Sequence, residues 1–390
     1  MPGRELEAEL RVGVSFYTSA LCYSVIRLEP YTTCALACSY CYARWYRPEG
    51  RPEAKMWLVK PLERLWSGLS ARGLRLVPFR LSTLSDPLQP LEEGAKLTLA
   101  FLRMALRHRV PVVLNTKRVL FACHPWSEAI TDLASRGLLV LQISLSTLDE
   151  EVARVLEPRA PPPAERLEKA GELSGEVPLV VRLQPLVPGL FEREREELVE
   201  AIAQAGARQV VVEFLRETPE GLQAIYGRLA QLDPALGGAP CAWESYSLAG
   251  GRLRRPSLPY RREILAWLRE RLARHGITLG TCKEGIFELQ DGRDCCGFRF
   301  LDSEKVAYRL TLYDIWRAGG SLEQALEEAA RAGDVLYGPR LAPYPRPIRR
   351  ALRAHENKLL RALERPYVLT RVCSSFYERL YPSFKHLIFT

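Results

Sequence analysis

Residues 31–42 read YTTCALACSYCY, and their three cysteines, Cys34, Cys38 and Cys41, follow a short apolar run at residues 23–28. Thiolates are the soft ligands of iron–sulfur clusters, and three of them hold three irons of a [4Fe–4S] cube while the fourth iron stays open. A closed zinc site needs four ligands, commonly as two close pairs, and no second CxxC or HxxxH follows within zinc-finger distance. The spacing therefore predicts an open iron–sulfur site after a strand. A zinc-knuckle fragment and three core cysteines are the alternatives.

Outward from this loop, the chain alternates short β-rich runs with helical stretches from Val25 to about Leu232. This alternation is typical of a parallel sheet with helices packed outside it. Apolar side chains three and four residues apart, as at Leu97, Phe101 and Met104, indicate buried helix faces. We therefore expect an α/β fold, a partial (β/α)6 barrel with a mostly helical carboxyl-terminal extension. The predicted strands are residues 23–28, 76–82, 110–115, 138–144, 178–184 and 209–214.

Polar residues stand where the predicted strands end. In barrels of this kind, functional residues lie at the carboxyl ends of the strands. A single serine or threonine at such a place is commonly a helix cap, but together with the cysteine loop these ends predict a rim that binds a ligand. The residues are Ser85, Asp86, Lys117, Ser144, Arg182 and Gln184.

The CxxxCxxC spacing, with Tyr40 just before the last cysteine, resembles that of the radical S-adenosylmethionine (SAM) enzymes. The resemblance implies a [4Fe–4S] cluster whose open iron is chelated by the amino and carboxylate groups of SAM. It also implies that an added electron cleaves SAM to methionine and a 5′-deoxyadenosyl radical, which abstracts hydrogen from the substrate. The cofactor supplies such chemistry, while the protein binds, orients and excludes side reactions.

Further stretches narrow the resemblance to the spore photoproduct lyase and DNA repair photolyase group. Several matching segments in one order are more specific than a single motif. The stretches are YTTCALACSYCYAR (31–44), STLSDPLQPLE (82–92), NTK (115–117), ISLSTLDEEVARVLEPRAPPPAERLEKAGEL (143–173) and VRLQPLVPGL (181–190).

Carried over residue by residue, the resemblance assigns roles to single side chains. It implies that Lys117 meets the SAM carboxylate, as a countercharge should, with a surface lysine as the alternative. Ser144 matches a contact to the amino or ribose end of SAM. Tyr42 matches a tyrosine that relays a hydrogen atom in the lyases and is the candidate catalytic residue, although packing against the cluster accounts equally well for Tyr40 and Tyr42. The predicted cofactor-binding set is Tyr40, Ser85, Asp86, Lys117, Ser144, Arg182 and Gln184.

The chain departs from the lyases at Thr83. The lyases carry a cysteine there, two residues before the serine matched by Ser85, and it returns a hydrogen atom to the substrate radical. An O–H bond is too strong for this role, and no cysteine lies between Cys41 and Cys123. The sequence therefore argues against thymine-dimer reversal and leaves the general radical mechanism in place.

A second group of cysteines, Cys282, Cys295 and Cys296, lies beyond the predicted barrel. Clustered soft ligands suit an auxiliary iron–sulfur cluster, with Cys373, Cys241 or a substrate atom as the fourth ligand. Zinc, redox-active or hydrogen-donating thiols and ordinary buried cysteines are the alternatives.

The charge of the chain indicates its partners. The 390 residues carry a net charge of +9, nearly all of it from arginine, because lysine occurs only nine times. Arginine matches phosphate geometry, so nucleic acid is one expected partner. An acidic ferredoxin or flavodoxin that delivers the electron would use the same positive field.

Other features of composition bear on the setting of the protein. The charged amino terminus does not read as a signal peptide, and no apolar run approaches the roughly 18 residues of a membrane span. With ten cysteines, we therefore expect a cytoplasmic, reducing location and no membrane partner. Abundant arginine, glutamate, leucine and proline with very little asparagine suggest a thermophile. The oligomeric state is left open.

We expect four parts: an amino-terminal segment 1–22, the barrel 23–232, a lid with the second cysteine group 233–296, and a basic and aromatic extension 297–390. The aromatic and basic residues between Tyr367 and His386 would stack on bases and pair with phosphates, or would dock the tail onto the domain. Helices are predicted at residues 260–275, 321–332 and 347–363.

Three hypotheses for function follow. The first is a radical SAM enzyme that abstracts hydrogen from DNA or RNA. The second keeps this chemistry for a peptide, protein or small molecule and uses an auxiliary cluster. The third is a non-catalytic metal-containing protein that binds nucleic acid.

Overall fold

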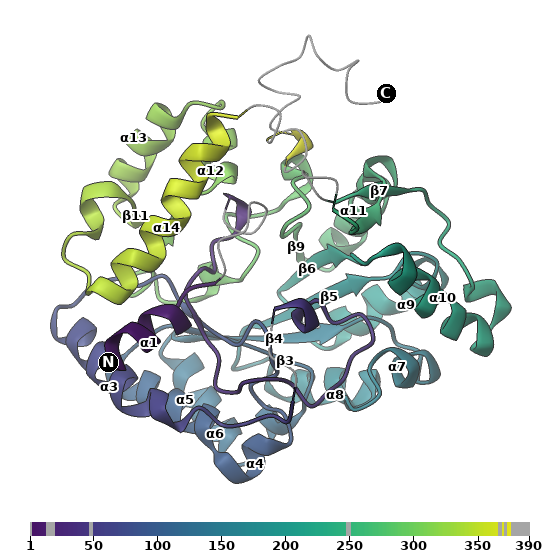
Figure 1. The fold of residues 1–390 in the computed structure, drawn as a ribbon, viewed down its shortest axis with the longest axis horizontal. Helices are drawn as coiled ribbons and strands as arrows, with labels where there is room; N and C mark the ends of the chain where they lie inside the picture. Colours follow the sequence, from purple (N-terminus) through teal and green to yellow (C-terminus); the bar gives the residue numbers. More distant parts are fainter. Residues whose placement is uncertain are drawn as a thin grey trace.

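The computed structural model describes residues 2–12, 20–46, 50–246, 251–365, 369 and 373–375. Its centre is a parallel sheet of seven strands in the order β1-β2-β3-β4-β5-β6-β9 (Figure 1). The strands are β1 (Arg27–Leu28), β2 (Phe79–Leu81), β3 (Val112–Thr116), β4 (Leu139–Leu145), β5 (Leu179–Leu186), β6 (Gln209–Phe214) and β9 (Thr278–Gly280).

The predicted α/β fold and its six strands are confirmed, and β9 is a seventh strand that pairs with β6. Within the described residues β1 and β9 are the two edges, so the sheet is an open partial barrel. The first two strands are shorter than predicted. Ile26 forms an antiparallel bridge with Arg11, and Leu76 bridges to Val306 instead of extending β2. Ile26 and Leu76 therefore pair with other segments of the chain and not with the neighbouring strand of the sheet.

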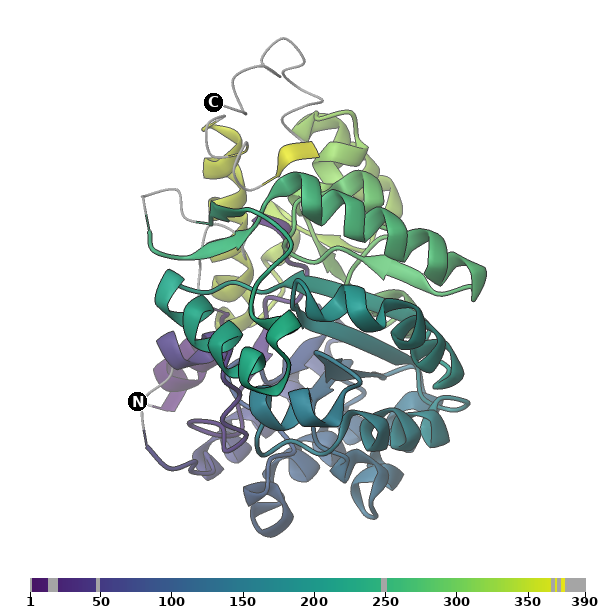
Figure 2. The same cartoon turned by 90° about the vertical axis from the view of Figure 1, so that its right-hand side faces the viewer.

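Helices cover the outer face of the sheet (Figure 2). Every residue of β4 is buried, as is typical of a parallel strand covered on both sides. Along this layer α3 contacts α5, α5 contacts α6, α8 contacts α9 and α9 contacts α11. The helices of this part are α3 (Val59–Ala71), α4 (Leu91–Ala95), α5 (Leu97–His108), α6 (Trp126–Ser135), α7 (Glu150–Leu156), α8 (Pro163–Leu173), α9 (Leu190–Gln204), α10 (Pro219–Leu232) and α11 (Leu258–Arg274).

The carboxyl-terminal part is mostly helical, as predicted, and the three predicted helices are α11, α13 and α14. In this part α14 packs against α1 at the amino terminus (Figure 1). The predicted aromatic and basic residues at 367, 376–377, 381 and 384–386 lie outside the described residues. The remaining elements are α1 (Pro2–Glu9), α12 (Leu312–Arg317), α13 (Leu322–Ala332), α14 (Arg346–Leu363) and the parallel pair β10 (Tyr308–Arg309) and β11 (Val335–Leu336).

The segment after α10, predicted as the start of a lid, contains a short antiparallel hairpin of β7 (Trp243–Ser245) and β8 (Arg254–Pro256). The four-part division of the chain stays a prediction. Of the helices in the described ranges, none combines the length and the apolar character that crossing a membrane requires.

Glu194 of α9 ties this helix to the loop after β4 and gives a testable pH dependence. Its Oε2 accepts hydrogen bonds from Thr147 Oγ1 and Leu148 N, both at 3.0 Å. Burial raises the pKa of Glu194 to about 7, so the folded protein holds the proton that the unfolded chain has lost. The stability from this protonated state is complete below the unfolded pKa of about 4.3 and is lost as the pH rises through about 7.

We therefore expect Glu194→Gln to raise the free energy of unfolding at pH 8 by about 2 kcal/mol relative to wild type, and to have little effect at pH 4.5. Urea denaturation at both pH values measures the difference. The exposed Glu197 is the matched control, since Glu197→Gln should leave the pH profile of stability unchanged. Parallel pH profiles for wild type and the Glu194 variant would show that Glu194 does not titrate as described.

Candidate active site

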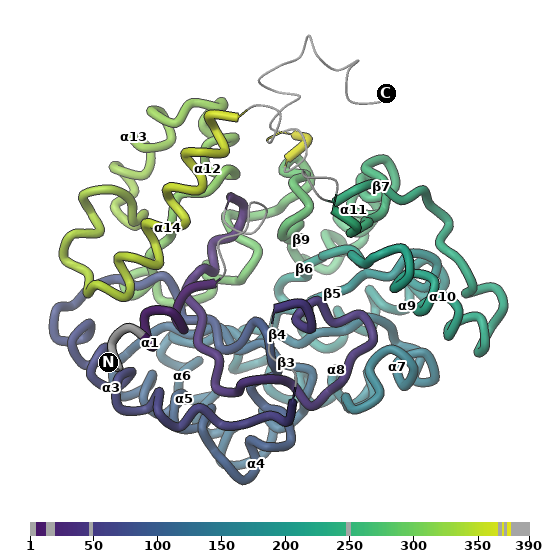
Figure 3. Tube along the Cα trace, viewed as in Figure 1, coloured from purple at the N-terminus to yellow at the C-terminus, as the bar shows by residue number. Residues whose placement is uncertain are grey.

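The three-cysteine loop lies at the carboxyl ends of the strands, where residues 31–42 pass beside β4 and β5 (Figure 3). Ala35 N donates a hydrogen bond to Gln89 Oε1 (2.8 Å), in the segment after β2. Ser39 N donates to Leu156 O (2.8 Å), at the end of α7 after β4. Ala37 has a φ of 53°, in the left-handed region. The loop is thus fixed by partners from two other βα units.

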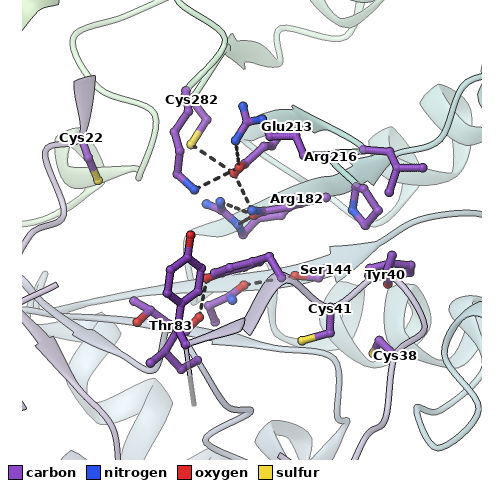
Figure 4. A pocket seen from close by; sticks show the side chains of 18 of the residues that line it. Cys22, Cys38, Tyr40, Cys41, Thr83, Ser144, Arg182, Glu213, Arg216 and Cys282 are labelled. Atoms are coloured by element: carbon purple, nitrogen blue, oxygen red, sulfur yellow. Dashed lines mark hydrogen bonds and ion pairs between the residues drawn. The ribbon is translucent and has the colours of Figure 1, made fainter. Parts of the chain in front are cut away.

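Two cavities meet at this loop. The smaller, of about 100 Å³, is lined by Cys34, Cys38 and Cys41, and the larger has a volume of about 600 Å³. Cys38, Cys41, Lys117 and Ser144 line both. Figure 4 shows Cys38, Cys41, Tyr40 and Ser144 on one side of the larger cavity. Its volume lies within the roughly 300–1,000 Å³ of small-molecule sites.

The structure brings the sequence-predicted residues together around these two cavities, except for Cys295, which is buried and lines neither of them. Their roles in binding stay predictions. Ser85 and Asp86 line the smaller cavity with the three cysteines. The predicted residues that line the larger cavity are Tyr40, Tyr42, Lys117, Ser144, Arg182, Gln184, Cys282 and Cys296.

A buried ionic network behind the loop contains Tyr40 and Lys117. Both contact Glu157: the Tyr40 hydroxyl donates a hydrogen bond to it, and Lys117 Nζ lies 3.2 Å from its Oε1. Arg166 Nη2 lies 2.5 Å from Oε2, and Ser146 Oγ donates to Oε1 at 2.8 Å. Burial alone would raise the pKa of Glu157, but Lys117 and Arg166 lower it to about 2. Glu157 is therefore an anion that holds two cations at the cavity wall.

Glu29, at the end of β1, organises the loop after β2. Its Oε1 accepts hydrogen bonds from Thr83 N (2.5 Å), Thr83 Oγ1 (2.6 Å) and Leu84 N (2.8 Å). Ser85 Oγ donates to Oε2 at 3.1 Å. The hydroxyl of Thr83 is thus engaged in a structural hydrogen bond, as is that of Ser85.

Asp86 joins the loops after β2 and β3. Its carboxylate accepts hydrogen bonds from Thr116 Oγ1 (2.7 Å), Lys117 N (2.7 Å) and Leu88 N (2.9 Å). Burial raises the pKa of this carboxyl group, and the hydrogen bonds from Lys117 N and Thr116 oppose the rise. Asp86 therefore places the backbone of Lys117 at the cavity.

On the other side of the larger cavity, Glu213 gathers polar groups from β5 and from the segment after β9. Gln184 Nε2 donates to its Oε2 (2.5 Å), and Lys283 Nζ lies 3.0 Å from its Oε1. Arg182 Nε donates to Gln184 Oε1 (2.9 Å). Burial raises the pKa of Glu213, but Lys283 and Arg216 outweigh this and lower it to about 2.

Tyr42 lies at the cavity wall with 36% of its surface exposed. Its hydroxyl donates a hydrogen bond to Thr83 O, and Lys283 Nζ lies 5.5 Å from the centre of its ring. The side chain therefore faces both the loop after β2 and the segment after β9.

The second cysteine group meets this same cavity. Cys282 Sγ lies 3.9 Å from Glu213 Oε2, and the Sγ atoms of Cys295 and Cys296 are 3.8 Å apart. Cys22 lines the cavity with Cys282 and Cys296. Cys241, one of the expected fourth ligands, instead has Glu192 as its charged neighbour. In the described part of the chain, no three His, Cys, Asp or Glu side chains converge to hold a single metal ion.

Several of these residues gave no signal in the sequence. Glu29, Glu157, Glu213 and Lys283 are single charged residues outside any motif, and their partners are distant in the chain. Glu157 stands in the matched stretch 143–173, which is the one hint that its position matters.

Comparisons with known proteins identify a matching family and solved structures with a similar fold. Residues 28–202 match the family model of the radical SAM superfamily. A spore photoproduct lyase mutant shares 16% identity with a TM-score of 0.50, over 69% of this chain and 80% of that one. SuiB of Streptococcus suis, solved with bound S-adenosylmethionine, shares 15% identity with a TM-score of 0.43, over 67% of this chain and 50% of that one.

A virus protein is similar in sequence over a shorter range. An uncharacterized protein of Acidianus two-tailed virus is 34% identical over 134 residues, which are 32% of this chain and 42% of that protein. The chain thus matches less than half of the length of this relative. Residues 28–202 therefore match the radical SAM superfamily, and the described chain, with its cysteine loop at the carboxyl edge of the sheet, has a fold similar to that of spore photoproduct lyase.

Proposed function

We propose that this radical SAM enzyme abstracts a hydrogen atom from a nucleic-acid substrate. The observation that carries the proposal is the lining of the larger cavity, where arginines and aromatic rings occur together. Glu213 is the one carboxylate among the described residues of this lining. The cationic side chains of the lining are Arg27, Arg80, Lys117, Arg182, Arg216 and Lys283.

Part of this positive charge is not neutralised by the protein. Arg27 and Arg80 line the cavity and form no ion pair with any carboxylate in the described ranges. Uncompensated cations in a cavity favour an anionic ligand, and a phosphate backbone is such a ligand.

Aromatic side chains stand at the same cavity. Trp45 and Tyr46 line it and are 37% and 65% exposed. The guanidinium of Arg44 lies over the Trp45 ring at 5.2 Å from its centre, and the Tyr42 and Tyr46 rings are 6.4 Å apart in an edge-to-face arrangement. Exposed rings beside cations are the combination that binds single-stranded nucleic acid by base stacking and phosphate pairing.

The residues at the loop fit the family's cofactors, a [4Fe–4S] cluster and SAM. Lys117 Nζ is buried, and Glu157 is the carboxylate that forms an ion pair with it. An ammonium group has three donors, so this lysine has hydrogen-bonding capacity left for the carboxylate of a ligand. The space around it is the junction of the two cavities. Cys34, Cys38 and Cys41 would therefore hold the cluster, and Lys117 and Ser144 would contact SAM.

When bound, these cofactors supply a 5′-deoxyadenosyl radical for hydrogen abstraction. The chain itself contributes three things. Glu157 holds Lys117 in place through an ion pair, Glu29 and Asp86 fix the loops after β2 and β3, and Tyr42 stands between the cysteine loop and Lys283. We keep Tyr42 as the candidate catalytic residue. The proposed electron donor is a cytoplasmic ferredoxin or flavodoxin.

The proposed reaction is not the reversal of a thymine dimer. Thr83 stands where the lyases carry their hydrogen-donating cysteine, and its hydroxyl donates to Glu29 Oε1 at 2.6 Å. An alcohol held in this way cannot replace a thiol as the hydrogen-atom donor. A modification or another repair step on DNA or RNA remains the proposal.

A peptide, protein or small-molecule substrate is the second candidate. It is favoured by Cys282 and Cys296, which line the wall of the larger cavity together with Lys283 and Glu213. Thiols in that position, or an auxiliary cluster that they hold, would lie next to a substrate of any of these classes.

Binding of single-stranded DNA and RNA 12-mers at several salt concentrations tests the proposal. Trp45→Ala should weaken binding about 5- to 100-fold, which corresponds to the loss of one base stacked on a ring. Arg27→Ala should lower the slope of log affinity against log salt by about 0.7. Arg331, exposed at the end of α13, is the matched control, and Arg331→Ala should change neither value. Affinity that is absent, or that is insensitive to salt and to both cavity variants, would favour the second candidate.

A further inference from the structure

Three thiols from three separate segments line one region of the larger cavity, and a fourth thiol lies behind them. Cys282 follows β9, Cys295 and Cys296 form a vicinal pair, and Cys22 comes from the amino-terminal segment. Cys22, Cys282 and Cys296 line the cavity, and Cys295 lies behind them at 3% exposure. Figure 4 shows Cys22 and Cys282 on the opposite side of the cavity from Cys38 and Cys41.

We propose that Cys22, Cys282, Cys295 and Cys296 hold a second iron–sulfur cluster. Four thiolates are the ligand set of [2Fe–2S] and [4Fe–4S] clusters, and soft sulfur ligands select such metals over oxygen-seeking ions. All four cysteines are free of disulfide bonds. The sequence offered Cys241 and Cys373 as the fourth ligand, whereas the thiol that shares the cavity wall is Cys22, within electrostatic range of both Cys282 and Cys296.

The vicinal pair is held by a dedicated set of hydrogen bonds. Asp294 is fully buried, and its Oδ1 accepts from Cys296 N (2.7 Å) and Phe298 N (3.0 Å). Gln142 Nε2, from the middle of β4, donates to Cys296 O at 2.8 Å. A Cβ atom on Gly280 would come within 3.1 Å of Cys295 Cα, so glycine allows β9 to approach the pair. The turn is therefore fixed before any metal binds.

Cys282 and its surroundings complete the site. Its backbone has a φ of 41°, a left-handed conformation that is uncommon in residues other than glycine and is concentrated at functional sites. Arg182 and Lys283 are the cations near its thiol. Positive side chains of this kind offset the negative charge of thiolates and of the cluster that they bind. The left-handed backbone of Cys282, the nearby cations and the four thiols together form a site that is suited to an iron–sulfur cluster.

A single zinc ion would require the thiols to converge on one point. No three of them do so in the described chain, and the same is true of Cys34, Cys38 and Cys41. In a [4Fe–4S] cube each thiolate binds a separate iron, whereas in a [2Fe–2S] cluster each iron takes two thiolates. The Sγ atoms of Cys295 and Cys296 are 3.8 Å apart, which is about the spacing of two thiolates on one tetrahedral metal. The vicinal pair therefore suits one iron of a [2Fe–2S] cluster, and the sulfide count distinguishes this arrangement from a single zinc ion.

The test measures iron, sulfide and zinc in protein purified and reconstituted without oxygen, so it does not depend on the substrate. The variant with Cys34, Cys38 and Cys41 all changed to alanine lacks the first site. It should retain at least about two irons per chain with equal sulfide, while wild type carries that number above the roughly four irons of the first cube. Adding Cys22→Ser to this triple variant should remove at least half of the retained iron.

Two controls show whether a loss of iron comes from the cysteine that is changed or from unfolding of the variant. Cys123 is exposed, and Cys123→Ser in the triple variant should leave the retained iron unchanged. Circular dichroism compares the folding of each variant with wild type. A folded triple variant without iron and sulfide, or with one zinc in their place, would overturn the proposal. A wild-type chain limited to about four irons would overturn it even if the triple variant failed to fold.

Discussion

Replacing Cys38 with alanine is expected to lower the yield of 5′-deoxyadenosine from SAM and dithionite at least about 1,000-fold, to the uncatalysed background. Cys38 lines both the small cavity of the cysteine loop and the larger cavity beside it. A cube with one open iron has three protein ligands, so the loss of one thiolate leaves two corners without a ligand. We also expect the iron of this site to be lost, because metal affinity depends on the full ligand set.

Cys123→Ala provides the matched control, since this cysteine is exposed and outside both cavities. It should retain the wild-type yield of 5′-deoxyadenosine. The iron content of both variants should be measured on the same preparations. A Cys38 variant that keeps more than a tenth of the wild-type yield would exclude this loop as the cluster site.

Glu157→Gln is expected to lower the free energy of unfolding at pH 7 by about 3–5 kcal/mol, since the removal of one partner leaves buried charges uncompensated. Arg166 is 1% exposed and lies 2.5 Å from Glu157 Oε2, and Lys117 lies 3.2 Å from Oε1. The amide keeps the size of the side chain and removes only its charge. Urea denaturation at pH 7 measures the loss, and Glu168→Gln, at an exposed position of α8, should change stability by less than about 0.5 kcal/mol.

The same ion pairs give a pH dependence. The folded pKa of Glu157, at about 2, lies below its unfolded value of about 4.3. The stabilisation is therefore complete above the unfolded pKa and is lost as the pH falls from about 4.3 through about 2. The gap between wild type and Glu157→Gln should narrow over this range. A gap under about 1 kcal/mol at pH 7 would mean that Lys117 and Arg166 do not need this carboxylate.

Much of the fold could be predicted because it is encoded locally. β3 to β6 read as continuous apolar runs, and the structure places them within two residues of their predicted bounds. The predicted strand at 23–28 is longer than β1 for a physical reason: residues 23–26 are buried, but only Arg27 and Leu28 pair with β2. Burial alone does not make a strand, and the sequence does not show which buried residues find a partner.

The candidate site divides in the same way. The cysteine spacing and the polar strand ends are local patterns, and they led to residues that line both cavities. Glu29 acts on Thr83 across 54 positions, and Glu157 acts on Tyr40 across 117. Cys22 has no neighbouring cysteine in the sequence. Such partners meet only because distant segments lie side by side in the folded protein. Neither the periodicity nor the spacing of residues in one sequence reveals this.

The proposed function requires that Cys34, Cys38 and Cys41 hold a cluster that binds and cleaves SAM. Its most direct test is the formation of 5′-deoxyadenosine by the wild-type protein, reconstituted without oxygen and given SAM and dithionite. We predict about four irons at this loop and 5′-deoxyadenosine that forms only when protein, SAM and reductant are all present. Zinc at the loop, or a fully reconstituted cluster that leaves SAM intact, would contradict the account.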